Sequence, residues 1–192
     1  MIRLALVGDI GCGKTHIAKL FGCPVFNADL EVSKLYRSSR KCFNRLKKAI
    51  PDHIFSFPIK KSQITQAILF NNVNLKKVVR IVHPEVRRKM NNFIKKNKKK
   101  KIIVLDIPLF IENKLNKKND ILIFIDAKKK EIEKRLKRRK NFNLKIVKKL
   151  KKFQLPLEIK KRKSDFIIKN NFRNNFVKKS VRVIKYKILL NA

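Results

Sequence analysis

Short apolar runs alternate with segments of helical periodicity along the whole chain. The runs are rich in Ile, Leu, Val and Phe and have the length of buried strands; they cover residues 2–7, 24–26, 102–106, 121–125 and 165–168. Between them, apolar positions recur every three or four residues, as on one face of a helix. The clearest of these segments are residues 14–21, 30–36, 43–50, 62–69, 75–98, 128–140, 143–153, 156–163 and 174–190. Strands that alternate with helices predict an α/β fold, in which helices flank a parallel sheet.

Proline and capping residues set some of the expected helix boundaries. We expect residues 75–98 to form one long basic helix that is interrupted at His83-Pro84, because a proline removes a backbone hydrogen bond and clashes with the preceding turn. Ser62 and Asn143 each precede an apolar periodic segment. Their side chains can accept a hydrogen bond from the first turn, so both are expected as helix caps.

The loop between the first strand and the first helix carries a phosphate-binding motif. Gly8-Asp9-Ile10-Gly11-Cys12-Gly13-Lys14-Thr15 fits the pattern G-x-x-x-x-G-K-[ST], which requires a strand before it and a helix after it. Its glycines let backbone N–H groups approach phosphate oxygens, and the helix adds the positive end of its dipole. Lys14 can reach the β- and γ-phosphates, and the Thr15 hydroxyl can bind Mg²⁺. We therefore favour phosphate binding over a chance lysine after a glycine turn.

Two aspartates stand at the ends of predicted strands. Asp29 follows the run at 24–26, at the edge where open α/β sheets bind ligands. There it could accept a proton from an attacking hydroxyl, or it could be only the N-cap of the next helix. Asp106 ends the run at 102–106 and resembles the Walker B aspartate, which helps to hold Mg²⁺.

Two further sets of charged residues are weaker candidates. A lone histidine is usually a surface or core residue, but His83 beside the proline, with Arg87 one turn on, could hold an anionic substrate. Arg135 and Arg139 lie one turn apart on one face of the predicted helix at 128–140. In so basic a helix, a solvated face is the simpler interpretation of that pair.

Length and cysteine content favour a soluble, cytoplasmic, single-domain protein. The chain has 192 residues, enough to bury a substantial core. No apolar run approaches the length of a membrane span, and the run at 4–7 is too short for a secretory signal. The three cysteines are odd in number and show no C-x-x-C pair. They support neither a disulfide framework nor a zinc site.

The formal net charge of +39 points towards nucleic acid or anionic membranes as partners. However, lysine runs occur in almost every segment, and the chain is also rich in Asn, Ile and Phe. Our hypothesis is that a genome-wide compositional bias set most of the charge. We therefore expect no specific nucleic-acid partner, no membrane partner and a monomer.

The order of the motifs resembles the dephospho-CoA kinase family along nearly the whole chain. The matching elements are G-D-I-G-C-G-K-T (8–15), N-A-D (27–29), H-P-E-V-R (83–87), D-I-P-L-F-I-E (106–112), the R-x-x-x-R of Arg135 and Arg139, Q-x-P-x-E-x-K (154–160) and S-D-F-I-I-x-N (164–170). The resemblance implies MgATP-dependent phosphorylation of the ribose 3′-hydroxyl of dephospho-CoA. It also implies a P-loop NTPase-type core (about 1–36, 100–127 and 164–192), a helical substrate-binding insertion (about 37–99) and a helical lid (about 128–163).

The resemblance also assigns roles to individual residues. Asp29 matches the proposed general base, and Lys14 acts with it in catalysis. ATP is bound by Gly11, Cys12, Gly13, Lys14, Thr15, His16, Arg135 and Arg139. The acceptor substrate is bound by Asp29, His83, Pro84, Arg87, Pro108, Leu109 and Glu112. Lys160 joins the two arginines in the lid, and Mg²⁺ is held by Thr15 with Asp106.

The chain departs from the family pattern at three positions. Asp9 stands where the family loop usually has glycine, which puts a carboxylate beside a phosphate site. Asn27 replaces the first aspartate of the family's D-A-D, but Asp29 is retained, so we expect activity. Lys160 stands where some members carry arginine, which gives up bidentate geometry.

Two other functions fit parts of the sequence. One is another P-loop kinase that phosphorylates nucleosides or nucleotides. The other is a basic nucleic-acid-binding protein with a vestigial P-loop, which would show steeply salt-dependent binding to DNA or RNA. No aromatic-rich RNA-binding signature or zinc-finger pattern is present to support it.

Overall fold

The computed structural model describes residues 1–139 and 142–190, and the chain divides into two compact units. The core unit comprises Met1–Asn27 and Asn97–Ala192, and the helical unit comprises Ala28–Lys96. The helical unit thus begins before residue 37, where the sequence placed the start of the insertion. The assignment of 128–163 as a lid stays a prediction.

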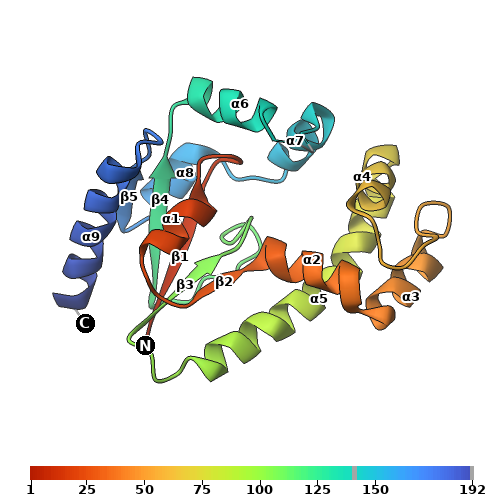
Figure 1. Ribbon diagram of the computed structural model, residues 1–192, viewed down its shortest axis with the longest axis horizontal. Coiled ribbons are helices and arrows are strands. Elements are labelled where there is room, and N and C mark those ends of the chain that lie inside the picture. The colour runs from red at the N-terminus through yellow and green to blue at the C-terminus, as the bar shows by residue number, and fades with distance from the viewer. Residues whose placement is uncertain (140–141, 191–192) are drawn as a thin grey trace. The chain divides into compact units, whose positions relative to one another are not determined.

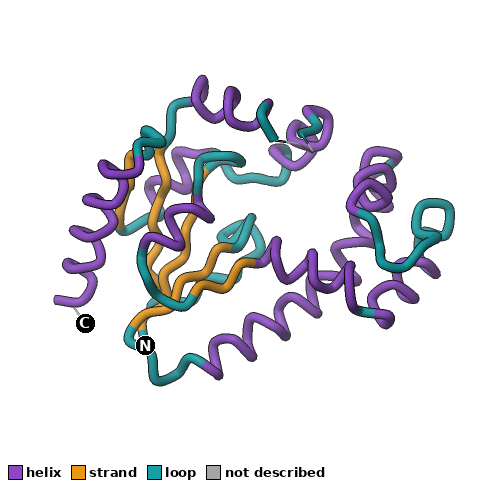
Figure 2. The backbone as a smooth tube through the Cα atoms, viewed as in Figure 1, coloured by secondary structure: helices purple, strands orange, loops and turns teal. Residues whose placement is uncertain are grey.

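The core unit is built on a parallel sheet of five strands, as the apolar runs predict. The strands are β1 (Ile2–Gly8), β2 (Val25–Asn27), β3 (Ile102–Asp106), β4 (Asp120–Asp126) and β5 (Phe166–Lys169). They lie in the order β2-β3-β1-β4-β5, and all four neighbouring pairs are parallel. Figure 2 shows the strands in orange. The middle of the sheet is buried on both faces, which is why these strands are continuous apolar runs instead of alternating ones.

The strand register brings the candidate loops to one edge of this sheet. Asn27, the last residue of β2, pairs with Asp106, the last residue of β3. Gly8, the last residue of β1, pairs with Ile125 in β4. Because the carboxyl ends of parallel strands meet at one edge, the phosphate loop and the Asp106 carboxylate share that edge.

The core unit also contains helices. They are α1 (Lys14–Leu20), α6 (Lys129–Lys137), α7 (Leu144–Lys151), α8 (Leu157–Arg162) and α9 (Asn174–Leu190). Figure 1 shows α1 and α9 running alongside the strands. Their apolar side chains share one buried cluster with the sheet: Leu4, Leu6, Ile17, Phe21, Val104, Ile123, Ile125, Val177, Val181 and Ile188. Each such side chain contributes about 1.5–3 kcal/mol on burial.

Arg3 is a charged residue inside the central strand β1, with only 8% of its surface exposed. Its guanidinium donates a 2.9 Å hydrogen bond to the Asp120 carboxylate at the start of β4. Burial raises the pKa of the Asp120 carboxyl, and Arg3 is among the neighbours that oppose the rise. The pair explains how a cation is tolerated here, since a buried charge needs a partner.

The helical unit is formed by α2 (Ala28–Ser38), α3 (Arg40–Ala49), α4 (Lys61–Phe70) and α5 (Asn72–Lys96). The three shorter helices pack on α5. Its apolar core is separate from that of the sheet and contains Leu35, Phe43, Leu46, Ile54, Ile64, Val78, Ile81 and Val82. The unit therefore has a core of its own.

Two expected boundaries in the helical unit are wrong. Helix α5 is continuous through Pro84 and is not interrupted at His83-Pro84. Pro84 is exposed, and the buried Ile81 and Val82 hold the preceding turn against the other helices, so packing outweighs the lost hydrogen bond. Helix α4 begins at Lys61, so Ser62 lies in its first turn and is not its cap.

The end of α6 is also different from the prediction. The helix was expected over 128–140, but it ends at Lys137, and Lys140 lies outside the described residues. Arg139 follows in a tight turn, where its N–H donates to the Leu136 carbonyl at 3.1 Å. A run of like charges along this segment opposes a longer helix. Arg135 and Arg139 are therefore not on one helical face.

Candidate functional site

The phosphate loop joins the end of β1 to the start of α1, as its motif predicts. Lys14 folds back over the loop: its Nζ donates hydrogen bonds to the carbonyls of Gly8 (3.2 Å) and Asp9 (2.8 Å). Cys12 is fully buried, and burial raises the pKa of its thiol, a shift that the nearby Lys14 opposes. Cys12 therefore fills space under the loop as a neutral buried thiol.

Asn170 holds the back of the loop in place. Its Nδ2 donates to the Cys12 carbonyl at 2.8 Å, and its Oδ1 accepts the Phe172 N–H at 2.9 Å. Asn170 is buried and follows β5 directly. Gly13 lies against the same amide: a Cβ at this position would collide with the Asn170 Nδ2. The loop thus needs glycine at position 13 both for space and for its φ of 97°.

We expect Gly13→Ala to destabilise the protein by roughly 2–4 kcal/mol, from a left-handed alanine and the displaced Asn170 hydrogen bonds. Gly22→Ala is the matched control, since Gly22 also has a positive φ (60°) but open space around it. We expect that variant to lose only about 1 kcal/mol. Urea unfolding curves measure both. Equal losses would show that Asn170 does not restrict the loop.

Thr15 and Asp106 form the second part of the site. The Thr15 Oγ1 donates a 2.6 Å hydrogen bond to Asp106 Oδ2, and the same carboxylate oxygen accepts the Asn27 amide. Asp106 is 4% exposed. Asn27, a departure from the family pattern, thereby donates a hydrogen bond to Asp106. An ionised aspartate at position 27 would instead repel the Asp106 carboxylate.

A hydroxyl next to a carboxylate fits Mg²⁺, which prefers oxygen ligands. Among residues 1–139 and 142–190, no group of three or more His, Cys, Asp or Glu side chains gathers around a common point. Mg²⁺ does not need such a group, because it is usually bound by one or two carboxylates together with substrate phosphates and water. Thr15 and Asp106 are therefore suited to a magnesium ion that arrives with a nucleotide.

A buried ion pair connects two other motifs predicted to be functional. Lys160 Nζ lies 2.7 Å from Glu112 Oε1, and that oxygen also accepts the Leu155 N–H at 3.0 Å. The two charged side chains are only 3% and 10% exposed. Around this pair lies a narrow cavity lined by residues of the phosphate loop, of the 106–112 segment and of the 154–160 segment: Gly8, Lys14, Leu109, Phe110, Glu112, Gln154 and Lys160 among them. The structure thus brings three of the sequence motifs together.

We expect Glu112→Gln to lower the free energy of unfolding by about 3–5 kcal/mol, because it leaves the buried Lys160 ammonium unpaired. The double variant Glu112→Gln/Lys160→Met removes both charges and should recover most of that loss. Glu85→Gln breaks the exposed pair of Glu85 with Arg88 and should cost no more than about 1 kcal/mol. Urea unfolding tests all three; a double variant as unstable as the single one would contradict a buried pair.

Two of the other predicted ATP-binding residues, Arg135 and His16, contact residues that follow β5 in the chain. The Arg135 guanidinium stacks over the Phe172 ring at 4.5 Å, and the His16 ring contacts Asn174 Oδ1 at 3.2 Å. Arg139 lies beyond α6, as described above. Pro108 is exposed, and Leu109 has a φ of 55°, which is uncommon for leucine and typical of functional turns.

The remaining predicted residues belong to the helical unit. His83, Pro84 and Arg87 lie together in α5, and burial, with help from Arg87, lowers the pKa of the His83 ring. Asp29 lies in the first turn of α2 and is not its N-cap, because the helix begins at Ala28.

Three residues near the phosphate loop were missed by the sequence reasoning. Asn170 is the last residue of the S-D-F-I-I-x-N motif (164–170) of the family pattern, and this position could have indicated a functional role. Phe172 has a positive φ of 60° and stacks on Arg135, which no local pattern indicates. Lys151 pairs with Asp9 at 2.9 Å, but it stands in a lysine-rich helix where nothing distinguishes it from its neighbours.

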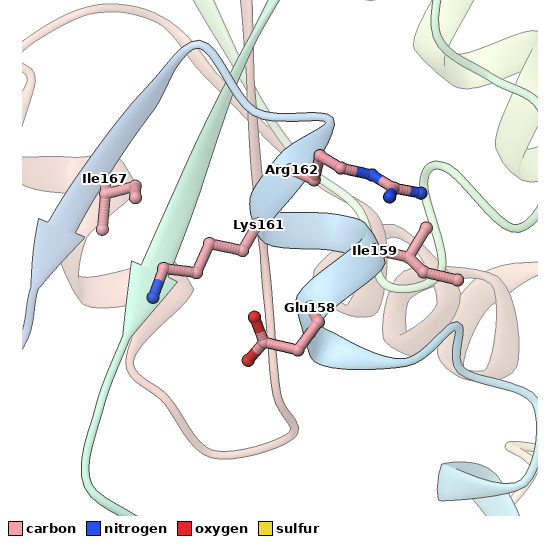
Figure 3. Close-up of a pocket in the computed structure, with 5 residues that line it drawn as sticks. All are labelled: Glu158, Ile159, Lys161, Arg162 and Ile167. Atoms are coloured by element: carbon pink, nitrogen blue, oxygen red, sulfur yellow. The ribbon is translucent and has the colours of Figure 1, made fainter.

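A wider surface depression of the core unit lies apart from this cavity. It has a volume of about 510 Å³ and is lined by Glu158, Ile159, Lys161, Arg162 and Ile167. Figure 3 shows Lys161 and Arg162 pointing to opposite sides of α8, so the two cations do not converge on one anion. No predicted site residue lines it. This depression is therefore not assigned to the functional site.

The core unit combines a parallel sheet with a phosphate loop after β1, a Thr15–Asp106 pair and the basic helix α7 beside the loop. These features define a P-loop kinase. Within that class, the chain belongs to the dephospho-CoA kinase family, because the family model for dephospho-CoA kinase matches residues 2–175. Members of this family are transferases that phosphorylate dephospho-CoA with ATP. No helix in the described part of the chain is both long and apolar enough to cross a membrane.

Individual relatives agree with the family match. The dephospho-CoA kinase of Wolbachia pipientis wMel is 31% identical over 194 residues, which cover 98% of this chain and 99% of the relative. The dephospho-CoA kinase of Bartonella quintana is 31% identical over 170 residues, 86% of this chain and 87% of its own.

Solved structures show the same fold. Dephospho-CoA kinase from Campylobacter jejuni is 25% identical, with a TM-score of 0.64 over 96% of each chain. TT1252 from Thermus thermophilus is 21% identical, with a TM-score of 0.75 over 97% of each chain. Shikimate kinase from Acinetobacter baumannii is 16% identical with a TM-score of 0.54, which is a likeness of fold alone.

Proposed function

We propose that the chain transfers the γ-phosphoryl group of MgATP to the ribose 3′-hydroxyl of dephospho-CoA. The observation that carries the proposal is the hydrogen-bonded set of Thr15, Asp106 and Asn27 at the carboxyl edge of the sheet, next to the phosphate loop with its Lys14. The membership of the chain in this family supports it. Phosphoryl transfer depends on positioning and charge stabilisation more than on covalent help from the protein.

The phosphate loop binds the donor. The backbone N–H groups of Gly11, Cys12 and Gly13 and the start of α1 provide a site for phosphate oxygens. Lys14, now bonded to two loop carbonyls, can turn its ammonium towards the β- and γ-phosphates. When bound, Mg²⁺ neutralises charge on those phosphates; Thr15 and Asp106 are the residues that would hold it.

Asp29 is the proposed general base. It stands two residues after Asn27, which donates to Asp106, so chain geometry keeps the two Cα atoms within about 7.6 Å. A carboxylate in this position can accept the proton of an attacking hydroxyl.

The substrate and lid residues complete the proposal. His83, Pro84 and Arg87 would bind the acceptor from the helical unit, and Pro108 and Leu109 from the core unit. Arg135 and Arg139 would contact ATP phosphates and stabilise the moving charge. Glu112 and Lys160 are bound to each other, so we assign them to shaping the cavity beside Lys14. One copy of the chain supplies every assigned residue, and we propose a cytoplasmic monomer.

A panel of acceptors tests the proposal. Purified protein with MgATP is offered dephospho-CoA, adenosine, AMP and shikimate, and the product is analysed by mass and by the position of the new phosphate. We expect transfer to dephospho-CoA at the 3′-oxygen and little or none to the others. Preferred transfer to a nucleoside or to AMP would contradict the assigned acceptor.

A further inference from the structure

Asp9 connects the phosphate loop to helix α7. Its Oδ1 accepts the Ile10 N–H at 2.7 Å, and its Oδ2 lies 2.9 Å from Lys151 Nζ. Its backbone carbonyl accepts Lys14 Nζ at 2.8 Å. Asp9 is therefore bonded on one side to the lysine of the phosphate loop and on the other to the last residue of α7.

A carboxylate in this loop is an electrostatic problem for a site that binds phosphates. The Asp9 side chain is 11% exposed, so water screens its charge only in part. An unneutralised anion here would repel the nucleotide that Gly11 to Thr15 bind. The Lys151 side chain is 41% exposed and reaches Asp9 from the solvent side, where its ammonium supplies the opposite charge.

We propose that Lys151 is a positioning residue that neutralises Asp9, so that this variant of the loop accepts ATP, and that the pair fixes the end of α7 against the loop. The proposal rests on the proposed function, in which the loop binds ATP phosphates. It explains how the chain can carry Asp9 where a glycine is usual and still be an active kinase.

Chance pairing is the competing explanation. The chain has 52 lysines and arginines and only 13 aspartates and glutamates, so an acidic side chain finds a basic partner easily. A chance pair would affect stability slightly and ATP affinity not at all. A neutralising pair makes a different prediction: the effect of losing Lys151 depends on whether Asp9 is charged.

Four variants separate the two explanations. Lys151→Met leaves Asp9 unneutralised and should weaken ATP binding about tenfold. Asp9→Asn keeps an acceptor for the Ile10 N–H and frees the Lys151 ammonium, so it should tighten ATP binding. The double variant Asp9→Asn/Lys151→Met should restore affinity to within about twofold of wild type. Lys148→Met removes the same charge from the same helix without touching Asp9 and should change affinity less than about twofold.

Calorimetric titration with a non-hydrolysable ATP analogue and Mg²⁺ measures these affinities, at low and at high salt. If Lys151→Met lowers stability, Lys151→Gln provides a second test of the same charge. Equal affinities for Lys151→Met and Lys148→Met would overturn the proposal, and so would a double variant that binds as weakly as Lys151→Met. If wild-type protein itself does not bind the analogue, the failure lies in the proposed function and not in the Asp9–Lys151 pair.

Discussion

Lys14→Ala is expected to lower kcat by about a hundred- to a thousandfold while the protein stays folded. The variant loses one charged hydrogen-bond donor that would stabilise the phosphoryl group during transfer, and losses of this size are typical of such a donor. Folding should survive because the Lys14 ammonium donates its hydrogen bonds to atoms of the loop itself, chiefly the carbonyls of Gly8 and Asp9. Steady-state kinetics with dephospho-CoA and MgATP give kcat, and far-UV circular dichroism monitors the fold.

Lys19→Ala is the matched control for this variant. Lys19 lies in the last turn of the same helix α1 and is exposed. It carries the same charge as Lys14 but stands more than a turn away from the phosphate loop. We expect its kcat to stay within about twofold of wild type, since exposed charges are largely screened by salt. A similar loss in both variants would mean that net charge matters, and not the position of Lys14.

The second large effect is expected for Asp29→Asn, which keeps the shape of the side chain but removes the proton acceptor. General base catalysis contributes roughly 10²–10⁴-fold, and kcat should fall by that factor. The KM for ATP should change little, because the loop residues that bind ATP are intact. Rapid-quench measurement of the single turnover separates the chemical step from product release.

Glu31→Gln is the control for Asp29→Asn. Glu31 is the other acidic residue in the first turn of α2, and it pairs with Lys34 at 2.6 Å and Lys89 at 3.2 Å. Its loss should reduce stability by about 1 kcal/mol or less and leave kcat nearly unchanged. Near-normal turnover in Asp29→Asn would show that Asp29 is not the general base.

Much of the core unit could be predicted from local patterns. Strands buried on both faces produce continuous apolar runs, and the glycine loop needs a strand before it and a helix after it, so β1, the loop and α1 follow from residues 2–21 alone. The Asp106 contact with Thr15 follows from the edge at which parallel strands end. The strands and the loop are thus encoded over short distances in the chain, and the contact between Thr15 and Asp106 follows from the parallel arrangement of the strands.

Other features depend on contacts that the sequence does not contain locally. The cost of Pro84 inside α5 is outweighed by packing on helices that lie elsewhere in the chain. The burial of Lys160 follows from Glu112, which is 48 residues earlier by their sequence numbers, and the backbone N–H of Leu155 shares that carboxylate. Lys151 differs from its lysine neighbours only in its distance from Asp9. The structure at such positions depends on packing and charge pairing between residues far apart in the chain. The periodicity of apolar residues contains no information about these contacts.

The most direct test of the central claim follows ADP formation by the wild-type protein with MgATP, with and without dephospho-CoA, together with the mass of the product. We predict that ADP appears only at a low background rate until dephospho-CoA is added. It should then form in equal amount to a product that is heavier than dephospho-CoA by one phosphoryl group. ADP formation that does not respond to dephospho-CoA, or an unchanged acceptor mass, would contradict the assignment of this site as a dephospho-CoA kinase centre.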